Sequence, residues 1–206
     1  LRYPQKFALI SLLFILPLAV VMYLLLSEIG DRIRFARQEI DGARYLRPLH
    51  AMQGHVGQSL FLTLAYRDGR AALRPDLIGK QAQIDEDLVA LEAVDRELGA
   101  GLNTVQRVGA LKENWRFLKE QTRNLSVGDA EALHDKLLAE IRHLMDAVGD
   151  ASNLILDPDL DTFYLMDSVL LKLPEGADLL LRARVLGRGV AQRPTATVPE
   201  RAEATR

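Results

Sequence analysis

Residues Phe7 to Leu26 read FALISLLFILPLAVVMYLLL, a stretch of twenty residues without a single charged side chain. Fourteen of the twenty are Leu, Ile, Val or Phe. A helix of this length spans about 30 Å, which matches the hydrocarbon core of a bilayer. Each large apolar residue contributes about −0.3 to −0.6 kcal/mol to insertion, or roughly −4 to −8 kcal/mol together. The stretch therefore predicts a transmembrane helix, and membrane helices tolerate a proline such as Pro17.

Two other interpretations of this segment fit less well. A cleaved secretory signal has an apolar core of about 7–15 residues and ends in small residues. Here residues 24–28 read LLLSE, with no A-x-A cleavage site. A buried helix of a soluble protein would need an apolar partner, and nothing downstream is apolar enough to enclose it. We therefore expect residues 1–27 to form a retained membrane anchor.

The bulk composition excludes several classes of function. The 206-residue chain has a net charge of −2, so we expect no nucleic-acid partner. It contains no cysteine, which rules out disulfides, thiolate catalysis, cysteine-ligated zinc and iron–sulfur clusters. Residues 28–187 are long enough for one extramembrane domain.

The anchor is predicted to continue directly into a long helix. Gly42 weakens this helix, and Pro48 predicts a kink. Residues 67–70, RDGR, predict the turn that follows it. After the anchor, apolar residues alternate at spacings of four and three, which is typical of one helix face: Ile29, Ile33, Ala36, Ile40, Ala43 and Leu46.

Three further helices are predicted, joined by short turns. The second should start near residues 75–76, where a proline favours a first turn, and end at the GAG sequence of residues 99–101. The third should start near Asn103, and the fourth at Asp129 as its N-cap. Short turns make consecutive helices antiparallel, and no useful period-two alternation indicates strands. The predicted fold class is all-α, a transmembrane helix continuing into an antiparallel bundle of the four-helix type over residues 28–187.

The apolar stripes of these three helices predict the core of the bundle. Four leucine or isoleucine residues of the first stripe recur every seven residues, a heptad spacing that also predicts a homodimer. Phe117 and its neighbour Trp115 are interpreted as packing residues and not as a ligand site. The stripes are Leu77, Ile84, Leu88, Leu91 and Leu98; Val108, Leu111, Trp115, Leu118 and Leu125; and Leu133, Leu137, Ile141, Leu144, Val148 and Ile155.

Residues 153–167, NLILDPDLDTFYLMD, differ from the repetitive helical stretches. Pro158 should interrupt the helix, and Asp159 can cap the next one. Pro174 should then end or kink that helix.

Three carboxylates at alternate positions of this segment suggest a cation site, at Asp157, Asp159 and Asp161. A calcium loop starting at the first of them would need Gly at its sixth position and Glu at its twelfth, where this chain has Thr162 and Ser168. A capped helix junction with solvated carboxylates is the preferred interpretation, and a polar ligand or subunit contact is the alternative. The candidate junction or ligand region comprises Asp157, Asp159, Asp161, Tyr164 and Asp167.

The histidines and the remaining charges form no recognised catalytic motif. His50 and His55 are five residues apart, and His134 and His143 nine apart, so neither pair has the i, i+4 spacing of a helical zinc site. The acidic run at residues 85–87 is interpreted as a solvated face. The chain also contains no phosphate-binding loop and no nucleophile elbow. We therefore predict no catalytic residue, metal site or cofactor in this stretch.

The two ends of the chain suggest a fragment. It begins at Leu1 and not at Met. Residues 197–200, TVPE, are typical of a helix start, yet the chain stops six residues later. A disordered tail explains the same composition equally well. We expect a truncated bundle, with residues 188–206 forming a linker or the start of a further helix.

Residues 3–11 (YPQKFALIS), the anchor, residues 45–49 (YLRPL), residues 153–167 and residues 172–175 (KLPE) together resemble the N-terminal sensory region of bacterial transmembrane receptors. These are hybrid sensor histidine kinases and related receptors, including methyl-accepting chemotaxis proteins. In such receptors a helical input domain lies between two membrane spans, and a kinase or signalling module follows. This chain has no second span, phosphoacceptor motif or ATP-binding glycine boxes, so the resemblance assigns any kinase activity to a longer protein.

The resemblance implies a sensory input region in a bacterial inner membrane, with a periplasmic bundle. Its stimulus would be an unknown small ligand or a periplasmic binding protein. Charge alone slightly favours the opposite orientation, because two cations precede the span and three follow it: Arg2 and Lys6, then Arg32, Arg34 and Arg37. The alternative function is a single-span, membrane-anchored helical scaffold or dimerisation protein.

Overall fold

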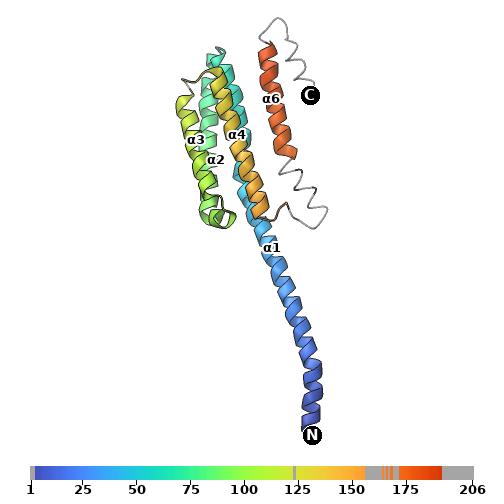
Figure 1. Ribbon diagram of the computed structural model, residues 1–206. Helices are drawn as coiled ribbons and strands as arrows, with labels where there is room; N and C mark the ends of the chain where they lie inside the picture. The colour runs from blue at the N-terminus through green and yellow to red at the C-terminus, as the bar shows by residue number, and fades with distance from the viewer. Residues whose placement is uncertain are drawn as a thin grey trace. The chain divides into compact units, whose positions relative to one another are not determined.

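The computed structural model describes residues 3–122, 124–155, 164, 166, 168 and 172–191. These residues are almost entirely helical and contain no strand, which confirms the all-α fold class (Figure 1). The chain divides into two compact units, Leu1–Ile40 and Asp41–Arg206. Helix α1, Tyr3–Arg67, contributes residues to both units, so the predicted continuation of the anchor into a long helix is confirmed.

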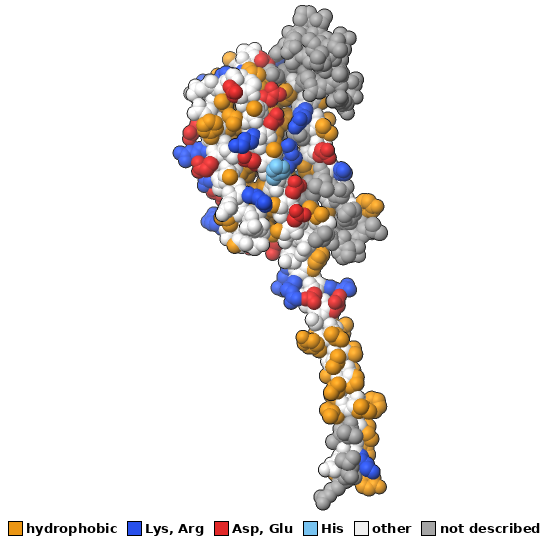
Figure 2. Space-filling model, viewed as in Figure 1, with side chains coloured by type: hydrophobic (Ala, Val, Ile, Leu, Met, Phe, Trp, Pro, Cys, Tyr) orange, Lys and Arg blue, Asp and Glu red, His pale blue; other side chains and the backbone are white. Residues whose placement is uncertain are grey.

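The first unit contains the N-terminal part of α1, in which residues 7–26 carry no charged side chain. Large side chains such as Leu13 and Phe14 are 71% and 73% exposed. Within the described residues, this is the one helix long and apolar enough to cross a membrane, and none of its apolar window is buried. Figure 2 shows apolar side chains covering this part of the helix and a band of charged ones following it. In that band Arg32 Nε donates to Glu28 Oε1 over 2.9 Å, and Arg34 pairs with Asp31.

Proline does not end α1. The helix runs through Pro17 and Pro48 and stops at Arg67. The predicted turn follows, with Gly69 at φ +92°, a left-handed conformation that glycine adopts without steric cost. One glycine that the sequence suggested as a weak point has a packing role, because a Cβ on Gly42 would lie only 2.1 Å from Ser152 Oγ. This glycine lets α1 approach the chain just after α4.

The second unit contains the helical bundle. A short 3₁₀ turn, Ala71–Leu73, leads into α2, Arg74–Leu102, which is followed by α3, Val105–Gln121, and α4, Val127–Ala151. Only residues 103–104 separate α2 from α3, and residues 122–126 separate α3 from α4, so these neighbours run antiparallel as predicted (Figure 1).

A single hydrophobic core joins α1 to the three helices that follow it. The predicted stripes supply most of it, but Leu98, Leu125, Leu133 and Ile155 are only partly buried at its edge. The heptad residues of α2 pack inside their own chain, so their spacing gives no support for a dimer. The largest fully buried side chains in the core are Trp115, Tyr45, Leu49, Met52, Ile84, Leu91, Leu111, Leu118, Leu137 and Ile141.

The packing prediction holds for Trp115 and is wrong for Phe117. Trp115 is 2% exposed, whereas Phe117 is 52% exposed. Residues that are two positions apart on a helix are rotated by roughly 200° about its axis, so the two rings cannot face the same core.

Two helix ends differ from their predicted positions. α2 continues through Gly99 and Gly101 to Leu102, and Asn103 takes the left-handed conformation, φ 56°, that closes it. Asparagine tolerates this conformation better than other residues with side chains. α4 starts two residues before Asp129, because the hydroxyl of Ser126 accepts a hydrogen bond from the Asp129 backbone N–H and is the N-cap.

The last described helix is α6, Leu173–Ala191. Pro174 lies in the first turn of α6, and the helix that it was predicted to end or kink lies mostly outside the described residues. A first turn has no intrahelical partner for the missing N–H, so proline is tolerated there. Gln53 Nε2 of α1 donates to the Pro174 carbonyl over 3.3 Å, and Leu181 packs against the core.

Candidate functional site

Most of the predicted junction region lies outside the described residues. This applies to Asp157, Asp159, Asp161 and Asp167. Tyr164 is described and is 63% exposed, and its carbonyl accepts a hydrogen bond from the Ser168 hydroxyl over 2.8 Å. Among the residues that the structure describes, no cluster of three or more His, Asp or Glu could hold a metal ion.

A cavity of about 460 Å³ between α1, α4 and α6 is a candidate site. Its size falls in the range of pockets that bind small molecules. His50, Gln53 and Gly57 contribute from α1, Leu138 from α4, and Arg184 from α6. Sequence analysis did not predict this cavity.

Two glycines of α1, which have no side chain, shape one wall of the cavity. Gly54 and Gly57 both line it. A Cβ on Gly57 would lie 3.2 Å from Leu181 Cδ2 of α6, closer than most such contacts, whereas a Cβ on Gly54 would meet open space. The glycines therefore allow α6 to approach while leaving room beside it.

A cation and an imidazole supply the polar chemistry of the cavity. The guanidinium of Arg184 lies over the ring of Phe61, with 3.7 Å from its Cζ to the ring centroid. His50 Nε2 is buried and has no hydrogen-bond partner among the described residues. Burial lowers the pKa of His50, so the ring is neutral near pH 7.

A buried polar cluster near the junction of α2 and α3 is structural. Asp95 of α2 accepts hydrogen bonds from the Tyr45 and Thr104 hydroxyls, each over 2.6 Å. Burial, and then the hydrogen bond to Asp95, raise the pKa of Tyr45, which therefore keeps its proton at neutral pH. The cluster ties α1 and α2 to the start of α3, and its side chains are all nearly inaccessible to solvent.

A serine–histidine contact in the core is likewise not a catalytic pair. His134 Nδ1 lies 2.7 Å from the Ala130 carbonyl, so Nδ1 carries the proton and Nε2 faces the Ser59 hydroxyl at 3.4 Å. Both side chains are only 1% exposed, so no substrate reaches them. Burial lowers the pKa of His134 to about 4, although its hydrogen bond to the backbone opposes that shift.

The acidic run was predicted to be a solvated face, and this is wrong for Asp87, whose side chain is 13% exposed. The Asp85 side chain is 43% exposed and still makes contacts between helices. Asp85 accepts hydrogen bonds from Trp115 Nε1 over 2.9 Å and from Lys119 Nζ over 2.5 Å. Asp87 Oδ2 lies 2.6 Å from His55 Nδ1. These carboxylates connect α2 to α3 and to α1.

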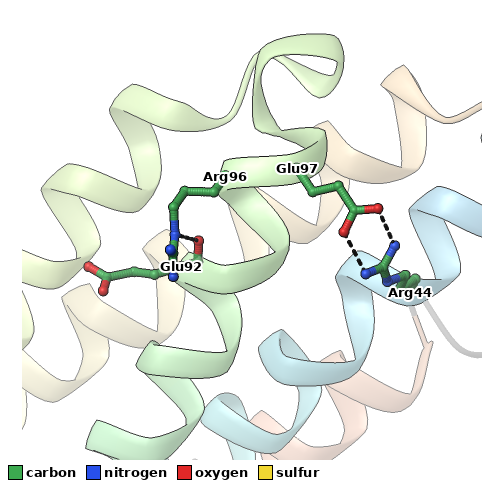
Figure 3. A network of polar contacts seen from close by, with 4 residues as sticks. All are labelled: Arg44, Glu92, Arg96 and Glu97. Carbon is green, nitrogen blue, oxygen red and sulfur yellow. Dashed lines mark hydrogen bonds and ion pairs between the residues drawn. The ribbon is translucent and has the colours of Figure 1, made fainter.

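A further polar contact joins α1 to α2 at the surface. Figure 3 shows Arg44 donating two hydrogen bonds to Glu97, over 2.7 and 2.6 Å. The same view shows Arg96 Nε donating to the Glu92 carbonyl over 3.4 Å. The hydrogen bond from Arg44 lowers the pKa of Glu97. Exposed pairs of this kind contribute little to stability, so the contact serves to align the two helices.

Comparison of the chain with protein-family models, curated proteins and solved structures finds no match in any of the three. The resemblance to bacterial receptors therefore remains an expectation. The fold and the cavity between α1, α4 and α6 are the features that bear on function.

Proposed function

We propose that this chain is the extracytoplasmic sensory input region of a bacterial transmembrane receptor. The bundle lies in the periplasm, and the apolar part of α1 crosses the inner membrane. A cytoplasmic output module, most simply a histidine kinase, belongs to the longer receptor. The chain supplies detection of the stimulus, and the catalysis belongs to the output module.

One observation carries this proposal: α1 contributes the apolar segment, one wall of the bundle and one wall of the cavity. A ligand that binds one packing arrangement of α1 better than another shifts the population between them. Small sliding or rotation of packed helices is an established form of switching. Because α1 is one helix, such a shift would alter the position of its apolar segment.

The test is a fusion of the full chain to the second span and kinase module of a characterised receptor. Gly42→Ala should change kinase output, because the new methyl group would displace α1 from Ser152. Gly30→Ala is the matched control, since a Cβ there meets nothing within 4 Å. Each variant fusion must still insert into the membrane and show native Trp115 fluorescence. If the Gly42→Ala fusion does not, Gly57→Ala, which introduces a less severe contact, replaces it. Unchanged output in a folded Gly42→Ala or Gly57→Ala fusion would refute the sensory proposal.

The alternative is a scaffold that pairs through α1. Between the apolar segment and the bundle, Ile29, Ile33 and Ile40 share one face and are 45%, 49% and 66% exposed. Because the chain has no cysteine, Ile33→Cys provides a clean cross-linking probe. Efficient dimer cross-linking together with an unresponsive fusion would favour the scaffold.

A further inference from the structure

We propose that the cavity between α1, α4 and α6 binds a small organic anion, a carboxylate attached to an apolar body. The inference rests on the proposed sensory function, for which it names the class of ligand. It follows from the charge and the apolar walls of the cavity.

The charge of the cavity favours an anion. Arg184 is the one side chain with a formal charge among the described residues that line it, and none of them is Asp or Glu. No carboxylate of the described residues forms an ion pair with this arginine. Arg184 is exposed, so a ligand can reach it, and a cation without a counter-charge among the described residues attracts a negatively charged ligand.

The orientation of Arg184 suits a carboxylate. Its face is occupied by the Phe61 ring, at 3.7 Å from Cζ to the ring centroid. Stacking restrains the guanidinium and leaves the N–H groups at its edge available. A carboxylate in the plane of the guanidinium can accept two of these N–H groups, the strongest common arrangement for this pair.

His50 is a second polar residue in the wall of the cavity. Its Nε2 is buried and has no hydrogen-bond partner among the described residues, which is costly for a polar atom. The imidazole is neutral near pH 7, so it adds no charge that would compete with Arg184.

The remaining surface requires an apolar body. Leu138 and Leu181 line the cavity, and Leu180 beside them is 74% exposed. A ligand with an aromatic or aliphatic group would cover this leucine and remove apolar surface from water. A volume of about 460 Å³ accommodates a small molecule and excludes a folded protein partner from the interior.

The direct test uses the full chain in phosphatidylcholine nanodiscs and ¹⁹F NMR of 4-fluorophenylacetate. Empty nanodiscs report partition of the probe into lipid. The neutral 4-fluorophenylacetamide and the cationic 4-fluorophenethylamine are matched probes of the same shape. We expect saturable binding of the acid alone, competed by unlabelled phenylacetate, benzoate and hexanoate.

Two variants locate the binding. Arg184→Gln should weaken acid binding by about tenfold or more, because it removes a charge-assisted hydrogen bond. Arg182→Gln removes the same charge from the same helix at a residue that does not line the cavity, and should leave binding unchanged. Ala177→Phe should block binding by filling the cavity, and native Trp115 fluorescence checks that each variant is folded.

Three results would overturn the proposal. The first is that none of the acids, at concentrations up to about 10 mM, shows saturable binding above the signal of empty nanodiscs. That concentration exceeds the dissociation constants of weakly bound small ligands. The second is equal binding of the acid and the amide. The third is acid binding that survives both Arg184→Gln and Ala177→Phe.

Failure of this site and failure of the sensory function can be told apart. If the acid binds in nanodiscs but Gly42→Ala leaves the kinase output of the folded fusion unchanged, the binding site is retained and the sensory function is refuted. A fusion whose output responds to Gly42→Ala, with no acid binding, retains the sensor and refutes the site.

Discussion

Helix α1 contains two stretches of similar length that meet opposite requirements. In residues 7–26 the described large apolar side chains are all exposed, and no charge interrupts them. In residues 45–64 most of the large apolar side chains lie on one face and are at most 4% exposed, while residues such as Arg47 and Gln58 are exposed. The buried face comprises Tyr45, Leu46, Leu49, Met52, Val56, Leu60 and Leu64. An all-round apolar helix needs an apolar solvent, whereas a one-sided helix needs other helices to cover it.

The comparison shows that the same helical backbone is stabilised by different surroundings in its two parts. The first stretch depends on its total hydrophobicity, and the order of its residues matters little. The second depends on the shape and hydrogen bonding of individual side chains, because the core packs closely around them. Substitutions should therefore have different effects in the two stretches.

The largest effect is expected from two charges in the apolar segment. Leu13→Arg combined with Leu16→Arg costs roughly 6–8 kcal/mol of insertion free energy, which is comparable to the total gain from the segment. The double variant should be lost from the membrane fraction after alkaline extraction. Leu13→Ile with Leu16→Ile should remain in it, and a double arginine variant that also remains would show that the segment is not a membrane span.

A cavity-forming change should reveal the close packing of the second stretch. Leu49→Ala should lower the free energy of unfolding of the bundle by about 2–5 kcal/mol, since Leu49 is completely buried. Leu16→Ala should leave that free energy unchanged. Denaturant unfolding followed by fluorescence of Trp115, the single tryptophan, measures both. Equal effects of the two changes would contradict the distinction between the stretches.

Acid should destabilise the bundle through His134. Its folded pKa of about 4 lies below the ordinary value of 6.5, so the unfolded chain binds a proton first as pH falls. The contribution of His134 to the free energy of unfolding is fully present above pH 6.5 and is lost as the pH falls from 6.5 to 4. The total loss is about 3 kcal/mol. His134→Leu should show a smaller loss over this window than the native chain. Parallel pH profiles of the two would show that His134 does not titrate in this range.

The smallest expected effect concerns a single hydroxyl. Tyr45→Phe removes one of the two hydroxyl hydrogen bonds to Asp95 and should cost about 1–3 kcal/mol of bundle stability. Tyr23→Phe, in the apolar segment, should cost none of it. Unfolding in the same denaturant series compares them, and a Tyr45→Phe variant as stable as the native chain would remove the case for the buried network.

Several features of the fold follow directly from the sequence. The apolar segment, the turn at Gly69, the start of α2 near Pro75 and the buried stripe of α3 were all predicted from local signals. Helix ends were harder, because Ser126 and Asp129 are equally good capping residues and only the backbone geometry distinguishes them. The heptad of α2 was read correctly as a buried face, but periodicity does not reveal whether the partner belongs to the same chain.

The cavity could not be predicted, because its residues come from three helices that are distant in the sequence. Gly54 and Gly57 were the available signal, and a glycine within a helix more often indicates local weakness than a binding wall. His50, Leu138 and Arg184 share no motif, so nothing local connects them. The predicted junction candidates were chosen for their unusual composition, and four of the five lie outside the described residues.

The sequence by itself determined that this protein is helical and that one segment suits a membrane, because periodicity and hydrophobicity are local properties that add along the chain. The tertiary structure decided which faces meet, where Asp85, Asp87 and Asp95 find partners, and where a cavity lined by Arg184 forms. These features depend on side chains from different helices coming within a few ångströms of one another. Residue spacing within a single helix does not specify those distances.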